Sequence, residues 1–246
     1  MRLRRLRGAA FLAIAFGVAG ALHAQTEGGE FARALRRASE SIVRVSATFP
    51  LEKAPFRLDG ADATTSNTGF FVGPEGQVLT SLLGLAGCTD ITVVCTDGRE
   101  APAQVAAVDQ PSGLALLKAD LSGTAPLEFV KEPPAVGTWI LLASARRQDG
   151  GTAAVLAPGL VSSRRASVRL QGVNWQGLMV TSVNVRRGSA AAPLLDPGGR
   201  LAGVVLGVAS AGGAGDCLAL PSEDLAPILE QLREGRSRRL GWLGVS

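Results

Sequence analysis

The chain has 246 residues, of which 46% are apolar and 19% charged, with 31 glycines, 13 prolines and no tyrosine. This composition excludes a disordered chain, a collagen and a coiled coil, and the length suffices to bury a core without disulfides or metals. The formal charge of +4 comes from Arg2, Arg4, Arg5 and Arg7, because residues 1–24 contain no acid. The rest of the chain has 21 basic and 21 acidic residues, so we expect no nucleic-acid partner.

Residues 1–24 are typical of a secretory signal peptide. A basic start precedes an apolar run over residues 8–22, and small residues lie before Gln25. The run is shorter than the roughly 20 residues of a membrane-spanning helix. We therefore expect a periplasmic or secreted protein, cleaved after Ala24, with no membrane span after cleavage. A cleavage site after Ala21 and an uncleaved anchor remain alternatives.

Histidine and cysteine usage limits the chemistry of the exported chain. The only histidine is His23, so cleavage leaves no imidazole to act as a general base or metal ligand. This excludes Ser-His-Asp and Cys-His catalysis. The three cysteines, Cys88, Cys95 and Cys217, match no metal motif, and we interpret them as small buried residues, although their odd count leaves at least one thiol unpaired or bonded to another chain. No cofactor and no metal are expected.

After the expected signal peptide, the sequence has a short helical pattern with Phe31, Leu35 and Ile42 on one face. A first strand over residues 42–45 and a loop over residues 50–67 follow. Short apolar runs separated by turn residues then predict strands in two groups, on either side of a proline-rich link at residues 132–136. The runs are residues 69–72, 78–80, 91–95, 105–108 and 114–118, then 139–143, 156–162, 178–182, 193–195, 201–206 and 218–220. They indicate two small antiparallel barrels, followed by an amphipathic helix from Ser222 to Gly235.

Several motifs between Asn67 and Val245 occur in a characteristic order. They include Thr68-Gly69-Phe70, Gly76-Gln77-Val78-Leu79-Thr80, Asp97-Gly98-Arg99-Glu100, Leu114-Ala115-Leu116-Leu117-Lys118, Gly159-Leu160-Val161-Ser162, Gly199-Arg200-Leu201-Ala202-Gly203-Val204 and Gly241-Trp242-Leu243-Gly244-Val245. Together they resemble the trypsin-fold protease domain of HtrA-type serine proteases. The resemblance implies an all-β fold of two six-stranded antiparallel β-barrels with a short N-terminal helix and a C-terminal helix.

The resemblance also suggests how the chain is divided. We expect the signal peptide at residues 1–24, an N-terminal helix, first strand and loop at 25–66, the first barrel at 67–132, the second barrel at 133–221, and a C-terminal helix and tail at 222–246. HtrA-type proteases continue into PDZ domains, and no PDZ domain is expected here.

The family uses a Ser-His-Asp triad in the cleft between the barrels, and the flanking motifs locate its three positions at Leu83, Gly113 and Ala190. None of these residues can act as a nucleophile or a base, so we expect no catalytic residue. The oxyanion loop is left as a remnant, formed by Gly188, Ser189, Ala191 and Ala192. The alanines of this remnant disfavour the positive φ that glycines allow.

Arg186 and Arg187 lie directly before this loop and are candidate contacts for a carboxylate or phosphate. Further arginine pairs, at residues 146–147 and 164–165, are predicted in loops of the same barrel. A solvated basic face is the alternative interpretation.

These features predict an exported, catalytically inactive HtrA-like homologue, a pseudoprotease that binds unfolded or extended polypeptide. One alternative is a regulatory subunit that assembles with an active HtrA-type protease through the region of Phe31, since the resemblance implies trimers and leaves a homo-oligomer open. The other is an unconventional serine-type endopeptidase, for which Ser189 would be the remaining nucleophile.

Overall fold

The computed structural model describes residues 29–50, 63–170, 173–209 and 215–238. In these residues a helix over 29–39 precedes twelve strands, and a second helix follows them. The elements are β1 (Ile42–Phe49), β2 (Ala63–Phe71), β3 (Gln77–Ser81), β4 (Asp90–Cys95), β5 (Glu100–Asp109), β6 (Leu114–Ala119), β7 (Trp139–Gln148), β8 (Gly151–Leu170), β9 (Val173–Thr181), β10 (Pro193–Leu195), β11 (Leu201–Ala209), β12 (Asp216–Pro221) and α2 (Ser222–Arg233). The expected signal peptide and the tail motif at 241–245 lie outside the described residues.

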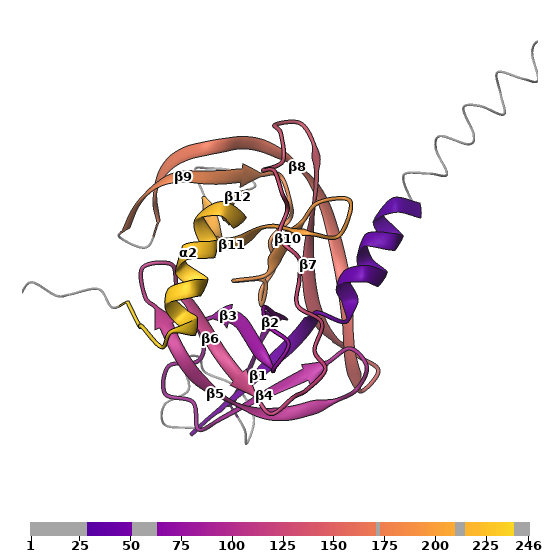
Figure 1. The fold of residues 1–246 in the computed structure, drawn as a ribbon, viewed down its shortest axis with the longest axis vertical. Coiled ribbons are helices and arrows are strands. Elements are labelled where there is room, and N and C mark those ends of the chain that lie inside the picture. Colours follow the sequence, from indigo (N-terminus) through magenta and orange to yellow (C-terminus); the bar gives the residue numbers. More distant parts are fainter. Residues whose placement is uncertain (1–28, 51–62, 171–172, 210–214, 239–246) are drawn as a thin grey trace, which may run out of the picture.

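The strands form two closed antiparallel barrels, which lie one above the other in Figure 1. The first has the order β1-β2-β3-β6-β5-β4, and the second has the order β10-β11-β12-β9-β8-β7. The expected all-β fold of two six-stranded barrels is therefore confirmed. The first barrel begins at Ile42 rather than at residue 67, because β1 pairs with both β2 and β4 and closes the sheet.

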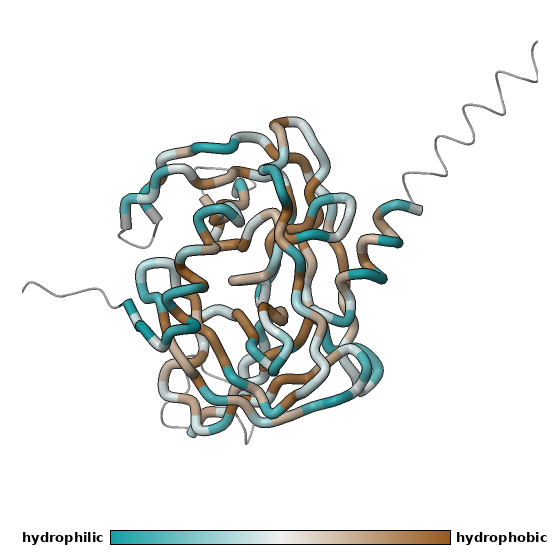
Figure 2. The backbone as a smooth tube through the Cα atoms, viewed as in Figure 1, coloured by the Kyte–Doolittle hydropathy of each residue, from teal (hydrophilic) through white to brown (hydrophobic). Residues whose placement is uncertain are grey.

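Three apolar clusters hold this architecture together. Alternate residues of β1, such as Val43 and Val45, point into the core of the first barrel, as expected for a strand with one buried face. A second cluster fills the second barrel. The third joins both barrels to α2 and includes Phe70, Leu141 and Leu229. Apolar segments accordingly follow the strands in Figure 2.

Some expected loops are strands. β2 begins at Ala63, inside the expected loop over residues 50–67, of which 51–62 lie outside the described part. β8 spans 20 residues, so the arginines at 164–165 lie in a strand, as do those at 146–147 in β7. All four arginines are exposed, and polar residues in these stretches hide the apolar pattern that predicts a strand.

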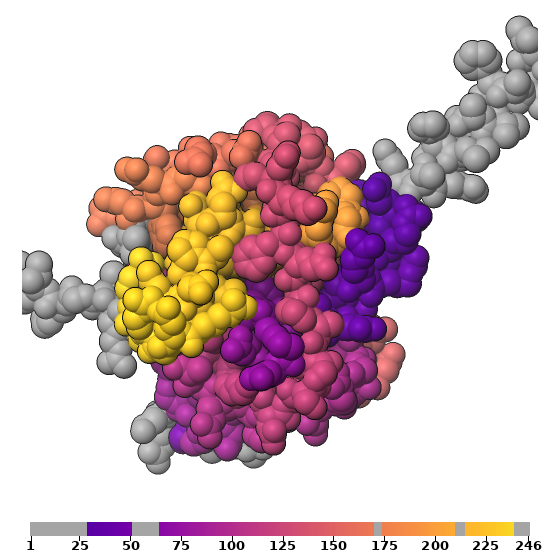
Figure 3. Space-filling model, viewed as in Figure 1, coloured from indigo at the N-terminus to yellow at the C-terminus, as the bar shows by residue number. Residues whose placement is uncertain are grey.

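The two helices lie against the barrels. α2 contacts strands of both barrels and buries Leu225, Leu229 and Leu232, and Figure 3 shows it across the front of the molecule. The N-terminal helix buries Ala34 and Ala38, and the Arg37 guanidinium donates to the Gly198 carbonyl after β10 (2.9 Å). Within the described residues, no helix has the length and apolar character needed to span a membrane.

The three cysteines are free thiols. Cys95 and Cys217 are buried, in agreement with their interpretation as small core residues, and Cys88 is half-buried.

Candidate functional site

The three predicted triad positions lie on three separate loops. Leu83 follows β3 and is 66% exposed, Gly113 lies in the turn between β5 and β6 with φ +67°, and Ala190 lies in the loop before β10. The first two loops are in direct contact, because the Leu82 amide donates to the Gly113 carbonyl (2.8 Å). That these residues replace a triad stays a prediction.

Two consecutive residues of β2 connect these loops to the loop of Ala190. The Asn67 side-chain amide donates to the Leu83 carbonyl (3.2 Å), and both the backbone N–H and the hydroxyl of Thr68 donate to the Gly188 carbonyl (2.9 Å each). The Thr68 hydroxyl also accepts the Ala145 N–H of β7 (3.2 Å). Thr68 thus joins the first barrel, the second barrel and the loop at Gly188. The sequence motif contains Thr68, but nothing in the motif indicates this role.

The oxyanion-loop remnant keeps an unusual backbone despite its alanines. Gly188 has φ +82° and Ala191 has φ +58°, a conformation that costs an L-residue about 1–2 kcal/mol. The Ala191 N–H donates to the Val205 carbonyl of β11 (2.9 Å), which fixes the loop on the sheet. Alanine disfavours positive φ, but Ala191 adopts it here because the surrounding sheet determines its conformation.

Two amides of this loop have no hydrogen-bond partner among the described residues. The N–H groups of Gly188 and Ala190 donate to no other described residue, whereas those of Ser189 and Ala192 donate to the Arg186 and Ser189 carbonyls. Unpaired N–H groups beside a cleft can donate to an acceptor on a ligand.

Ser189 is poorly placed as a nucleophile. Its side chain is buried, with 1% of the residue exposed, and its hydroxyl lies 3.3 Å from that of Ser144 in β7. No base lies beside it in the described structure: the Lys118 ammonium donates to the Glu75 carbonyl and carboxylate on the first barrel. The Ser144 contact was not foreseen, because the two serines are 45 residues apart.

Two hollows flank the Ser144–Ser189 pair. The first, of about 210 Å³, lies between the barrels and is lined by Ser66, residues 144–147 and residues 187–189. The second, of about 230 Å³, lies between β7, β8 and the loop before Gly188. Ser144, Arg146 and Ser189 line both hollows. The predicted pair is divided between them: Arg187 lines the first and Arg186 the second.

The surroundings of the first hollow are electropositive. Burial lowers the pKa of the Arg44 guanidinium on β1, and the positive charge of Arg147 lowers it further, against a weaker opposite effect of Glu100. Among the described residues, no carboxylate lies within 4.0 Å of a nitrogen of Arg146, Arg147 or Arg186. An anionic group of a ligand could therefore pair with these guanidinium groups.

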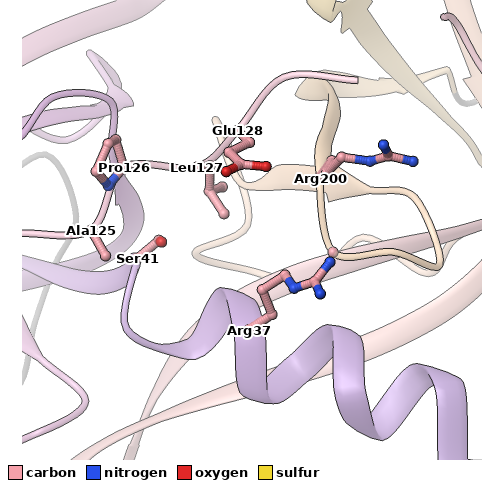
Figure 4. A pocket seen from close by; sticks show the side chains of 8 residues that line it. Arg37, Ser41, Ala125, Pro126, Leu127, Glu128 and Arg200 are labelled. Carbon is pink, nitrogen blue, oxygen red and sulfur yellow. The ribbon is translucent and has the colours of Figure 1, made fainter. Parts of the chain in front are cut away.

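A larger hollow, of about 390 Å³, lies away from the cleft beside the N-terminal helix (Figure 4). Its two arginines already have partners: Arg37 donates to the Gly198 carbonyl, and Arg200 pairs with Asp196 (2.8 Å). It is therefore the weaker candidate for a charged ligand. In the described part of the chain, no group of three or more His, Cys, Asp or Glu side chains is arranged to hold a metal ion.

A family model for the trypsin-like peptidase domain matches residues 67–204. The chain belongs to this family. The match starts in β2 and ends in β11, so it includes all three predicted triad positions and most of both barrels.

Relatives within the family agree with the HtrA-type resemblance. The chain is 29% identical over 195 residues to a probable periplasmic serine endoprotease, DegP-like, of Hahella chejuensis, covering 78% of this chain and 40% of that protein. A protein of the same description from Bartonella henselae is 28% identical over 182 residues, covering 72% of this chain and 35% of the relative. The chain thus spans about two fifths or less of the length of these relatives. Their periplasmic description agrees with the predicted export.

Solved structures show the same fold. The HtrA-type protease AlgW with a decapeptide superimposes with a TM-score of 0.69 at 22% identity, covering 88% of this chain and 71% of that one. The serine endoprotease from Yersinia pestis gives a TM-score of 0.66 at 22% identity, covering 84% of this chain and 68% of that one. At this identity, the likeness establishes the double-barrel architecture only.

Proposed function

We propose that this chain is an exported, catalytically inactive member of the trypsin-like family that binds unfolded or extended polypeptide in the cleft between its barrels. The observation that carries the proposal is the residue content of the three loops at this cleft. Leu83, Gly113 and Ala190 have no ionisable or nucleophilic side chain, and the described chain contains no histidine. Triad residues act as a unit, so their joint replacement removes the main source of peptidase activity.

Two structural features support a binding role in place of catalysis. First, the hydrogen bonds of Asn67 and Thr68 hold the loops of the cleft in a defined arrangement without any catalytic side chain. Second, β11 pairs with β10 only through residues 201–204 and continues to Ala209 with β12 on its other side. No described strand pairs with the β10-side edge of residues 206–209, and such an edge can accept an extended peptide by strand addition.

The same edge lies close to the loop at Ala190. Val205 exchanges hydrogen bonds with Ala191 and Ala192 (2.9 and 3.0 Å), so the open part of β11 begins one residue beyond the oxyanion-loop remnant. A peptide paired with this edge would extend past the unpaired N–H groups of Gly188 and Ala190. The HtrA-type protease AlgW, which has the same fold, is described with a decapeptide, and this supports a peptide as the ligand.

The proposal is tested with the purified chain and fluorescently labelled, denatured casein. We expect saturable binding by fluorescence anisotropy and, after overnight incubation, no new peptide termini by mass spectrometry. Absence of binding would refute the binding role. Cleavage that disappears in Ser189→Ala would instead establish the endopeptidase alternative.

A second candidate function is a regulatory subunit that assembles with an active HtrA-type protease. The observation that favours it is an apolar patch on the second barrel and the linker, formed by Val136, Trp139 and Leu160, which are 59%, 43% and 38% exposed. The ring of Phe31 packs edge-on against Trp139, with centroids 5.6 Å apart, so the N-terminal helix contributes to the patch. Size-exclusion chromatography with a co-expressed HtrA-type protease tests this function, since strict monomers or self-association alone would contradict it.

A further inference from the structure

We propose that the two hollows around Ser144 and Ser189 form a carboxylate-binding subsite, which gives the cleft a preference for acidic polypeptide segments. This inference rests on the proposed function and specifies its ligand class. The two hollows share Ser144, Arg146 and Ser189, and Arg186 and Arg187 line one hollow each. The guanidinium groups, the two hydroxyls and the Gly188 N–H are all hydrogen-bond donors.

One O–H group of the buried Ser144–Ser189 pair has no acceptor among the described residues. The two hydroxyl oxygens lie 3.3 Å apart, and either can be the donor of the bond between them. That bond uses one of the two O–H protons, and the described structure gives neither hydroxyl another acceptor. Ser144 and Ser189 are 6% and 1% exposed and line both hollows. The second O–H group can therefore donate to a ligand atom that enters either hollow.

The charges around the serine pair favour an anion over a neutral group. Arg146 and Arg147 extend from the end of β7, and Arg186 lies on the facing loop. No carboxylate of the described residues neutralises these three side chains. The planar guanidinium fork matches the two oxygens of a carboxylate, and such charge-assisted bonds are about twice as strong as neutral ones.

The size and position of the hollows favour a carboxylate borne by a polypeptide. Volumes of about 210 and 230 Å³ are smaller than the roughly 300–1,000 Å³ of sites for drug-sized ligands. They suit an Asp or Glu side chain or a C-terminal carboxylate. Gly188 lines the first hollow, and its loop pairs through Ala191 with the strand whose edge the extended peptide would use.

The test compares two unstructured, labelled peptides that differ only in Glu against Gln. We expect the chain to bind the Glu peptide about tenfold more tightly, a ratio in the range for a hydrogen bond to a charged group, and this preference should shrink as salt is raised. In Arg146→Gln/Arg186→Gln the preference should disappear, and Arg146→Lys/Arg186→Lys should keep part of it through charge alone. Both arginines are exposed, so thermal unfolding of the variants should match that of the parent.

The matched control is Arg164→Gln/Arg165→Gln, which removes the same charge from β8 outside the hollows. It should keep the full preference for the Glu peptide. An equal loss in the control would reduce the effect to net charge and overturn the subsite. Equal affinity of the parent chain for both peptides would overturn the subsite but leave the proposed function intact, whereas failure to bind either peptide would refute the proposed function itself. An amidated C-terminus on each peptide separates side-chain from terminal carboxylates.

Discussion

The two barrels differ in how their charged groups are paired near the cleft. In the first barrel, the carboxylate of Asp109 at the end of β5 is 2% exposed and accepts two hydrogen bonds from the Arg238 guanidinium (2.5 and 3.0 Å) and one from the Ser112 hydroxyl (2.5 Å). In the second barrel, Arg146 and Arg186 face their hollows without a carboxylate from any described residue.

This difference separates a structural role from a binding role. The first-barrel pair fastens the segment after α2, because the Arg238 backbone also donates to the Val108 carbonyl and accepts from Gln110 (2.9 and 2.8 Å). In a buried charge that is fully hydrogen-bonded, the hydrogen bonds offset the cost of burial, and few acceptor sites remain for a ligand. Exposed cations beside buried hydroxyls stabilise the fold little and leave their donors for a ligand.

The largest expected effect tests whether the stability of the fold depends on the backbone conformation of the loop before β10. Ala191 has φ +58° and is 2% exposed. Ala191→Val places a β-branched side chain in a left-handed conformation and overfills the core, so we expect a loss of about 3 kcal/mol in the free energy of unfolding. Urea unfolding measures it. Ala191→Gly is the control and should stay within about 1 kcal/mol, since relief of strain offsets the lost methyl group; equal losses would show that φ is irrelevant here.

The two-barrel fold was accessible from the sequence because its evidence is local. Each apolar run, such as residues 114–118, reflects a strand with a buried face, and turn glycines separate the runs. β1 was recognised as a strand but placed outside the barrel, since pairing between residues 42–49 and both β2 and β4 has no local pattern.

The candidate site was accessible only in part. Motifs around Leu83, Gly113 and Ala190 locate the three loops, and the pair at 186–187 suggested an anion. The joint at Thr68 and the contact between Ser144 and Ser189 bring together residues up to 120 positions apart. Such contacts form when the barrels close and pack against each other, so no local sequence pattern predicts them.

The second prediction compares the barrels through their thiols. Burial raises the pKa of Cys217, in the second barrel, from 9.0 to about 11, whereas Cys88 at the rim of the first is half-buried and its pKa is raised less. At pH 8 the thiolate population of Cys217 should be about a hundredfold below that of an unperturbed thiol, so Cys88 should react first with iodoacetamide, as read by mass spectrometry. Equal alkylation rates of Cys88 and Cys217 in the native protein would contradict the burial of Cys217 in the core of the second barrel.

The same shift has a consequence for stability. Below pH 9 the Cys217 thiol is protonated in both the folded and the unfolded state, so it adds no pH dependence. Between pH 9 and about 11 the unfolded chain releases the proton more readily, and the free energy of unfolding should fall. Cys217→Ala should remove this part of the slope, whereas Cys88→Ala should leave most of it.

The smallest expected effect tests the first barrel. Arg238→Ala leaves the buried Asp109 carboxylate with only its Ser112 donors, while the half-exposed position of the guanidinium limits the loss. We expect urea unfolding to show a decrease of about 2 kcal/mol. The control is Arg236→Ala, which breaks an exposed pair with Glu234 and should cost less than about 0.5 kcal/mol. Equal losses in the two variants would mean that burial of Asp109 does not make its ion pair more important than the exposed pair. The structural role assigned to the first-barrel pair would then be wrong.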